Sequence, residues 1–150
     1  TYRMQRGPSL RCGKVRVPGI AIRLQEDILM RPAVSILIPI YNVERYLREC
    51  LDSVVRQTLR EIEIICINDG STDESPEILS RYAARDSRIR IINQQNRGLP
   101  AARNTGLAAA RGKYVTFVNS DDWVEPQTME KILLHMQHQR LDILAFRFLS

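Results

Sequence analysis

Short apolar runs alternate with amphipathic stretches along most of this chain. Four runs rich in β-branched and other apolar residues predict buried strands at 34–38, 62–67, 88–92 and 114–118. Apolar residues at helical spacing predict helices at 47–55, 75–83, 100–111 and 129–136. A last apolar run predicts a fifth strand at 141–149. Because buried strands that alternate with helices form parallel sheets, the pattern predicts an α/β fold with helices on both faces.

Some helix boundaries also have sequence signals. Ser75 followed by Pro76 predicts a helix that starts with serine as its N-cap. Gly112 predicts the end of the alanine-rich helix before it. Glu125, next to Pro126, is an acidic residue of the kind that favours a helix start, and it predicts the beginning of the next helix.

The positive charge of the chain is concentrated at its N-terminus. The net charge is +5, and residues 1–31 hold seven Arg and Lys residues against two acidic residues. The remaining residues carry 15 basic and 15 acidic side chains, so they create no net basic field and argue against nucleic-acid binding. We therefore predict a basic extension at 1–31 outside a core at 32–150, with peripheral contact to an anionic membrane surface or another subunit as possible roles.

Cysteine usage and hydropathy favour a cytoplasmic protein. The three cysteines are odd in number and lack CxxC spacing, and Cys50 and Cys66 lie at apolar positions typical of core thiols. This pattern favours a reducing compartment. No apolar run reaches the roughly 18–20 residues that span a bilayer, and the N-terminus lacks the continuous apolar segment of a signal peptide.

A carboxylate pair follows the fourth predicted strand, in the stretch Asn119-Ser120-Asp121-Asp122. Two adjacent carboxylates at the end of a buried strand repel each other unless a cation lies between them. Mg²⁺ and Mn²⁺ take oxygen ligands, and Mg²⁺ is commonly held by one or two carboxylates together with substrate phosphates. The motif therefore suggests a site for a metal ion and a diphosphate. The alternative is a polar turn whose aspartates cap the next helix.

Two further polar clusters follow predicted strands, at 39–42 and 68–73. Because ligands of open α/β sheets bind outside the carboxyl ends of the strands, all three clusters are expected at one edge. An aromatic ring at Tyr41, a carboxylate at Asp69 and the carboxylate pair could hold a base, its amide edge and a diphosphate. No GxGxxG follows the first strand, which disfavours a dinucleotide-binding domain. Residues 106–114 resemble a P-loop, but they lead from a helix into a strand, the reverse of the required order.

Four segments resemble the family 2 glycosyltransferases, in order and at plausible spacing: Val34 to Asn42, Ile67 to Asp73, Asn96 to Asn104, and Gly112 to Asp122. That family has a GT-A fold, which is a Rossmann-like nucleotide-sugar-binding sheet. Its members invert the anomeric centre and use nucleotide-diphosphate sugars with Mg²⁺ or Mn²⁺. The resemblance therefore implies a donor that is a nucleotide-diphosphate sugar, with UDP as the expected nucleotide, and an acceptor that is a saccharide or a lipid-linked group.

The resemblance also implies roles for individual residues. Asp69 would bond the base edge, Arg103 would lie near the diphosphate, and Asp121 would contact the metal, with Asp122 as a possible outer neighbour. The full set expected to bind nucleotide is Pro39, Tyr41, Asn42, Glu44, Asp69, Gly70, Arg103, Asn119 and Ser120.

Two departures from the family pattern affect these expectations. Family members often have Asp at the position of Asn119, so the metal site has one charge less in this chain. Members also usually extend well beyond 150 residues, and no catalytic base is apparent up to Ser150, because His135 and His138 are expected to be surface or partly packed helix residues. We expect the chain to be the donor-binding part of a C-terminally truncated domain that transfers sugar poorly alone. A non-catalytic nucleotide-sugar-binding module and a nucleotidyltransferase remain alternatives.

Overall fold

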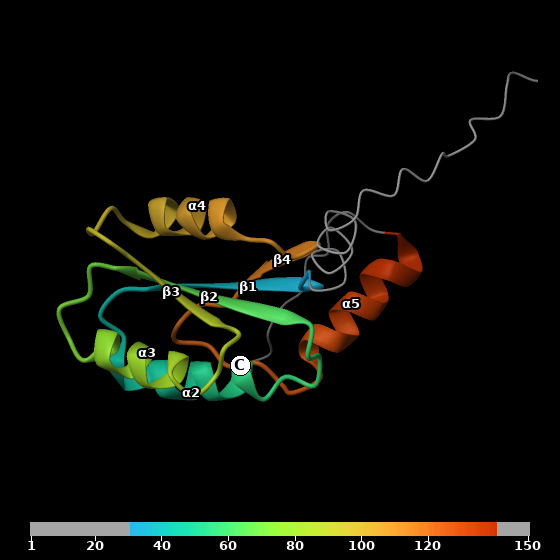
Figure 1. The fold of residues 1–150 in the computed structure, drawn as a ribbon, viewed down its shortest axis with the longest axis horizontal. Coiled ribbons are helices and arrows are strands. Elements are labelled where there is room, and N and C mark those ends of the chain that lie inside the picture. Colours follow the sequence, from blue (N-terminus) through green and yellow to red (C-terminus); the bar gives the residue numbers. More distant parts are fainter. Residues whose placement is uncertain (1–30, 141–150) are drawn as a thin grey trace, which may run out of the picture. The chain divides into compact units, whose positions relative to one another are not determined.

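The computed structural model describes residues 31–140 (Figure 1). The predictions for residues 1–30 and for the strand at 141–149 lie outside this range. The elements follow the order β1 (Val34–Ile40), α2 (Glu44–Val55), β2 (Ile62–Asp69), α3 (Ser75–Ala83), β3 (Ile89–Gln94), α4 (Leu99–Ala109), β4 (Tyr114–Phe117) and α5 (Thr128–Gln139). Every strand and helix predicted within the described range is present.

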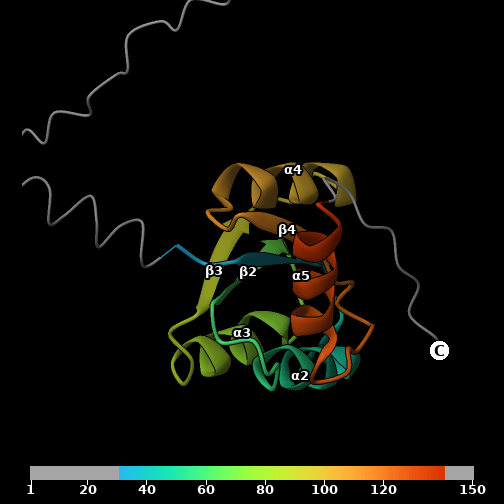
Figure 2. The same ribbon diagram turned by 90° about the vertical axis from the view of Figure 1, so that its right-hand side faces the viewer.

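The four strands form one parallel sheet in the order β3-β2-β1-β4. Helices α2 and α3 cover one face, and α4 covers the other (Figures 1 and 2). The handedness of βαβ units explains this arrangement, because such connections are almost always right-handed. The chain moves outward from β1 to β3 with α2 and α3 on one face. It then returns to the far side of β1, which places α4 on the opposite face. The predicted α/β sheet with helices on both faces is confirmed.

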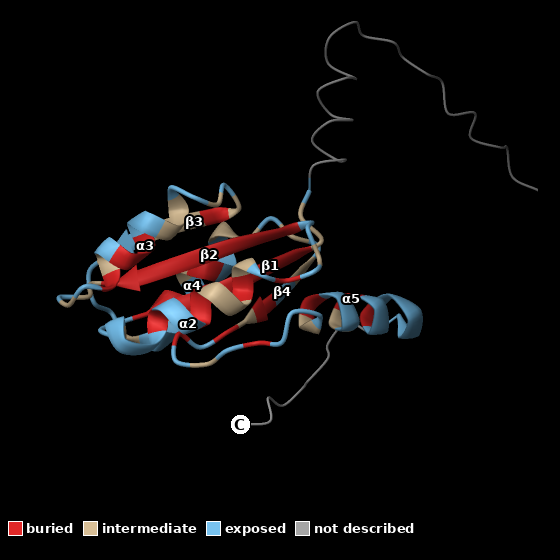
Figure 3. Cartoon of the chain, turned by 90° about the horizontal axis from the view of Figure 1, so that it is seen from below, coloured by how far each residue is buried: buried red, intermediate tan, exposed pale blue. Residues whose placement is uncertain are grey.

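The two central strands form the core of the sheet. Every residue of β1 and β2 is buried (Figure 3). The face under α2 and α3 holds the larger apolar cluster, and the face under α4 holds a smaller one that includes Leu37, Ile67 and Ala102. Helix α4 lies close to the sheet at Gly106, where an added Cβ would be 2.9 Å from Ile67 Cδ1 and 3.2 Å from Leu37 Cδ1. Small residues on α4 therefore allow its close approach.

Strand β1 is longer than predicted, because it continues through Pro39 to Ile40. Proline is rare within central strands, since it cannot donate a hydrogen bond to a neighbour. The Leu37 carbonyl accepts a hydrogen bond from the Val118 amide on the β4 side, and Pro39, two residues on, faces the same side. Pairing with β4 stops at Leu37, so no strand there requires the missing amide.

Two predicted helix starts are wrong. In both helices, a hydrogen bond to a distant segment involves the serine hydroxyl or backbone amide at the helix start. Ser75 is the first residue of α3 and not its cap. Its amide donates to Asp73 Oδ1 (2.9 Å), and its hydroxyl accepts a hydrogen bond from the Val43 amide (3.2 Å). Helix α5 begins at Thr128, after the Glu125-Pro126 pair. The Gln57 side chain accepts a hydrogen bond from the Met129 amide (3.0 Å), so a residue distant in sequence caps this helix.

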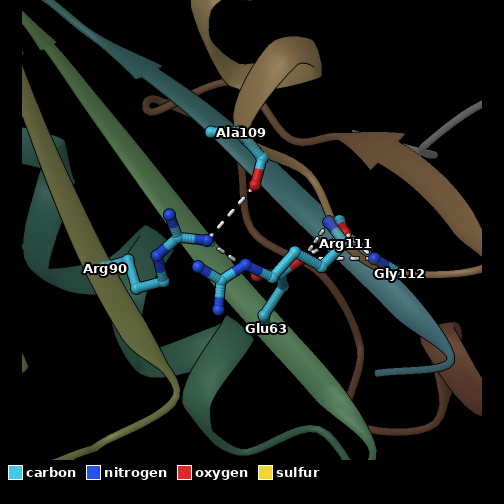
Figure 4. A network of polar contacts seen from close by, with 6 residues as sticks. Glu63, Arg90, Ala109, Arg111 and Gly112 are labelled. Atoms are coloured by element: carbon cyan, nitrogen blue, oxygen red, sulfur yellow. Dashed lines mark hydrogen bonds and ion pairs between the residues drawn. The ribbon is translucent and has the colours of Figure 1, made fainter. Parts of the chain in front are cut away.

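A buried carboxylate at the amino end of the sheet holds the segment that leaves α4 (Figure 4). Glu63 Oε1 accepts hydrogen bonds from the Ser35 hydroxyl and the Arg111 amide, both at 2.6 Å. Its Oε2 accepts one from Arg90 Nη1 at 3.1 Å. Gly112 lies against this network, and a Cβ there would be 2.6 Å from the Ser35 amide nitrogen. This network ties β1, β2 and β3 to the start of β4, at the opposite end from the predicted site.

Each helix in the described part of the chain is too short or too polar to span a bilayer.

Candidate functional site

A cleft of about 550 Å³ opens at the carboxyl edge of the sheet, beside β1 and β4, where the strand order reverses. Open α/β sheets bind ligands at this position. The structure brings six of the predicted site residues to the cleft, namely Pro39, Tyr41, Asp69, Asn119, Ser120 and Asp121. They come from the three segments that follow β1, β2 and β4, as the parallel sheet predicts.

Asp69 is the most strongly bound side chain in the cleft, and it is only 3% exposed. Its carboxylate accepts hydrogen bonds from Gln94 Nε2 (2.7 Å) and from the amides of Arg97 (3.0 Å) and Gly98 (2.8 Å). Burial alone would raise the pKa of this carboxyl group, but these hydrogen bonds outweigh burial and hold its pKa below the ordinary value. Asp69 is therefore an anion that organises the segment after β3.

That segment forms a wall of the cleft that the sequence-based site did not include. Asn96, Gly98, Leu99 and Ala102 line the cleft together with Tyr41. Gly98 has φ +84°, a conformation that favours glycine. These residues follow the third strand, so the rule that found the other three clusters could also have found this one.

Gly70 lies against the same segment but does not line the cleft. It has φ +74°, and a Cβ there would be 2.8 Å from the Asn96 amide nitrogen. Because Gly70 has no side chain, the loops after β2 and β3 can approach each other closely at this residue.

The motif after β4 is a closed turn. The Asp122 amide donates to the Asn119 carbonyl (3.1 Å), and Asn119 Nδ2 donates to Asp122 Oδ2 (2.9 Å). Below the turn, the Cys50 thiol donates to the Asn119 carbonyl at 3.5 Å. Burial, followed by the charges of Asp122 and Asp121, raises the pKa of Cys50 to about 12. The turn therefore keeps Asp121 exposed at the cleft while Asp122 binds Asn119.

The oxygen donors at this edge fit a hard divalent cation that also binds phosphate. Within residues 31–140, no three His, Cys, Asp or Glu side chains are grouped to hold a metal ion by themselves. Asp69 and Asp121 are the carboxylates among the described residues that line the cleft, and Asp69 is already hydrogen-bonded. One free carboxylate is compatible with Mg²⁺, which often takes its other ligands from substrate phosphates and water.

Several predicted residues lie outside the main cleft. Asn42 and Glu44 line a smaller cavity of about 340 Å³, which shares Val43 and Asp121 with the cleft. Arg103 lines neither cavity; its guanidinium carbon lies 5.3 Å from the centroid of the Phe117 ring, and its Nε is buried without a hydrogen-bond partner in the described structure. The predicted roles of these three residues in nucleotide binding stay predictions.

The other acidic and histidine side chains near the C-terminal end of the described chain do not reach the cleft. His135 and His138 are exposed on α5, as expected. Glu125 is exposed, and Glu130 accepts a hydrogen bond from the Thr58 hydroxyl at 2.7 Å. The cleft therefore contains no additional carboxylate from this region.

Comparisons with known proteins show the family to which this chain belongs. Residues 35–150 match the model of Glycosyl transferase family 2, and the chain belongs to this family. It is 50% identical over 119 residues to the uncharacterized glycosyltransferase EpsJ of Bacillus subtilis, covering 79% of this chain and 35% of EpsJ. It is 40% identical over 102 residues to a chondroitin synthase of Escherichia coli, covering 68% of this chain and 15% of that protein.

Solved structures resemble the described fold. TarS of S. aureus, as residues 1–349 in complex with UDP, is 30% identical with a TM-score of 0.67, covering 71% of this chain and 32% of that one. The mannosyltransferase PcManGT of Pyrobaculum calidifontis, in complex with GDP-Man and Mn²⁺, is 22% identical with a TM-score of 0.58 and covers 69% and 35%. This second likeness concerns the fold alone. The predicted GT-A fold is confirmed, and the chain spans about a third or less of these proteins.

Proposed function

We propose that this chain binds the UDP-sugar donor of a glycosyltransferase. The observation that carries the proposal is the convergence of Tyr41, Asp69 and Asp121 on one cleft of about 550 Å³. The three side chains offer an aromatic surface, a hydrogen-bond acceptor and a metal ligand, which are the chemical groups that a nucleotide diphosphate requires. The likeness to TarS, which was solved with UDP and with UDP-GlcNAc, supports UDP as the nucleotide.

The base is proposed to bind at the Tyr41 end of the cleft. The Tyr41 side chain is half-exposed, so its ring is available for stacking. Asp69 Oδ2 accepts a single hydrogen bond, from Gly98, and a carboxylate oxygen can accept more than one. It can therefore take the N–H that uracil presents between its two carbonyl groups. Pro39 and Leu99 line the same cleft and supply apolar surface for the base.

The diphosphate is proposed to bind beside Asp121, which would hold a Mg²⁺ or Mn²⁺ ion. Such an ion neutralises the charge that develops on the leaving diphosphate. The neutral Asn119 retains an amide oxygen that can serve as a ligand. Ser120 is buried beside Asp121 and lines the same cleft, so its polar groups are available to the phosphates.

The complete reaction is proposed to be transfer of the sugar, with inversion, to a hydroxyl of a saccharide or lipid-linked acceptor. The acceptor oxygen attacks the anomeric carbon while a base removes its proton and the diphosphate leaves. One observation favours a second candidate for this chain taken alone, a donor-binding module without transfer activity. Of the two described carboxylates in the cleft, Asp69 is proposed to bind the nucleotide base and Asp121 the metal ion. Neither is then free to remove the proton of the acceptor hydroxyl.

Titration calorimetry with UDP, in Mn²⁺ and in EDTA, tests the proposal. We expect binding that weakens at least tenfold without metal and in Asp121→Ala, and we expect GDP to bind more weakly than UDP. Glu49→Ala is a matched control, because Glu49 is exposed on α2 and lines neither the cleft nor the smaller cavity. Equal affinity with and without metal would remove the metal from the proposal, and absence of nucleotide binding would refute it. An assay of sugar transfer to several acceptors separates the enzyme from the donor-binding module.

A further inference from the structure

The loops after β1 and β2 are joined by a set of hydrogen bonds in which side chains bind backbone groups. Five residues contribute the side chains, and we call them the loop clamp: Asn42, Glu44, Ser71, Asp73 and Ser75. The segments they join, 42–44 and 71–75, are about 30 residues apart in the sequence.

Asn42 both donates a hydrogen bond to the second loop and accepts one from it. Its amide donates to the Ser71 hydroxyl (3.2 Å), and its side-chain oxygen accepts a hydrogen bond from the Thr72 amide (2.8 Å). Asn42 also has φ +51°, in the left-handed region that asparagine tolerates better than most residues. The side chain is exposed, yet its oxygen is committed to the neighbouring loop.

Glu44 and Asp73 form a reciprocal pair of caps for two helices. Asp73 Oδ2 accepts a hydrogen bond from the Glu44 amide in the first turn of α2 (3.0 Å). Glu44 Oε2 accepts one from the Glu74 amide, which precedes α3 (2.9 Å). Neither helix has a side-chain cap from its own N-cap residue. Each carboxylate therefore satisfies an amide of the other loop that would otherwise lack a partner.

The loop clamp borders the cleft next to Tyr41, and the smaller cavity lined by Asn42, Glu44 and Asp73 also includes Asp121. Tyr41 immediately precedes the first clamped segment, Asp69 lies just before the second, and Val43 lines both cavities. The Val43 amide donates to the hydroxyl of Ser75, which is completely buried. The distance between Tyr41 and Asp69 thus depends on hydrogen bonds that involve neither side chain.

We propose that the loop clamp preforms the base site, and that Asn42, Glu44 and Asp73 are positioning residues for Tyr41 and Asp69. This inference rests on the proposed function, because it concerns binding of the same nucleotide. It gives Asn42 and Glu44 a role that differs from direct contact with the base. A preformed site binds more tightly, because the ligand does not have to order the loops.

Ser75→Ala tests the proposal, since a fully buried hydroxyl cannot touch a ligand. The substitution leaves the Val43 amide without its partner. If the ligand must then order the loops itself, loss of one such hydrogen bond weakens the affinity by up to about tenfold. We expect this loss for UDP and for uridine alike, because the change affects the base end. Amide hydrogen exchange at Val43 and Glu44 should be faster in the free protein.

Ser80→Ala is the matched control on the same helix. The Ser80 hydroxyl is exposed and donates to the Pro76 carbonyl within α3, so neither affinity nor exchange should change. Ser71→Ala is a second test in case Ser75→Ala does not fold, because Ser71 lines neither cavity and binds the Asn42 amide. A similar loss of affinity is expected for this variant.

The outcomes separate the two proposals. Normal nucleotide affinity in both Ser71→Ala and Ser75→Ala would overturn the positioning role and leave the proposed function intact. Weaker UDP binding with unchanged uridine binding would also overturn it, because the effect would then lie at the diphosphate. A wild-type chain that binds no nucleotide would overturn both proposals. Weaker binding of both ligands, with faster exchange at Val43, supports the loop clamp.

Discussion

Replacement of Asp69 by Asn should weaken both the fold and nucleotide binding. The carboxylate accepts three hydrogen bonds, and the two from Arg97 and Gly98 come from backbone amides that cannot move independently of their loop. An asparagine side chain has nearly the same shape but keeps only one acceptor oxygen. Its NH₂ group must therefore face at least one N–H group, in whichever orientation it adopts.

The distances give the orientation of lowest cost. If the amide oxygen replaces Oδ1, the bonds from Gln94 and Arg97 survive, and the NH₂ group faces the Gly98 amide at about the present 2.8 Å. A hydrogen bond to a charged acceptor is worth about 1.5–3 kcal/mol, and an unsatisfied buried donor costs a similar amount. We expect Asp69→Asn to lower the free energy of unfolding by about 2–3 kcal/mol.

The loss of stability in Asp69→Asn, relative to wild type, should become smaller as the pH falls. The pKa of Asp69 is lowered in the folded protein because its hydrogen bonds outweigh burial. Its contribution to stability is therefore fully present above the unfolded pKa of about 3.9 and is lost as the pH falls through the folded pKa. The difference between wild type and Asp69→Asn should be constant from pH 7 to about 5 and should narrow below about pH 4.

Urea unfolding at several pH values, with UDP calorimetry at pH 7, measures both effects. We expect UDP affinity to fall at least tenfold, because an NH₂ group cannot accept the uracil N–H. Asp52→Asn is the control, since that side chain is 46% exposed and does not line the cleft. Its cost should stay below about 1 kcal/mol. A stability loss for Asp69→Asn below about 0.5 kcal/mol, or a difference that widens in acid, would refute the reasoning.

Three further predictions concern the rest of the described fold. Gly112→Ala should lower the unfolding free energy by about 1–3 kcal/mol in denaturant titrations, because its Cβ would lie 2.6 Å from the Ser35 backbone nitrogen. Glu63→Gln should cost about 2–4 kcal/mol in the same assay, because an amide cannot accept all the bonds that this carboxylate accepts. Cys50, with its pKa raised to about 12, should resist iodoacetamide at pH 8 in the native chain and react after unfolding, as peptide mass spectrometry can measure. Similar labelling in both states would contradict its burial.

The sequence predicts the fold because a strand that is buried in a covered sheet requires an apolar run of residues. The runs at 62–67 and 114–118 are apolar since both faces of a parallel sheet are covered, and they agree with β2 and β4 to within two residues at either end. The rule that ligands bind at strand ends then brings Tyr41, Asp69 and Asp121 to one edge without further information.

Contacts between distant segments explain what the sequence did not predict. The cap of α5 is supplied by Gln57, Asp73 binds the Glu44 amide in the first turn of α2, and Glu44 binds the Glu74 amide just before α3. No local pattern reports such a partner, because the same residues would be ordinary turn residues if the segments were apart. The end of β3 is a related case. The predicted strand at 88–92 ends before the polar Asn93 and Gln94, but pairing with β2 continues to Gln94.

The predicted and the unpredicted parts of the site depend on each other. Asp69 was predicted from the end of β2, yet its partners Gln94, Arg97 and Gly98 all belong to β3 and the segment after it. The same carboxylate that is proposed to accept the base therefore also orders the wall of the cleft that follows β3. A substitution at Asp69 cannot separate recognition from architecture, whereas Ser75→Ala can, because its hydroxyl contacts only the loops. The loop clamp is thus the place where positioning of the nucleotide can be measured apart from contact with it.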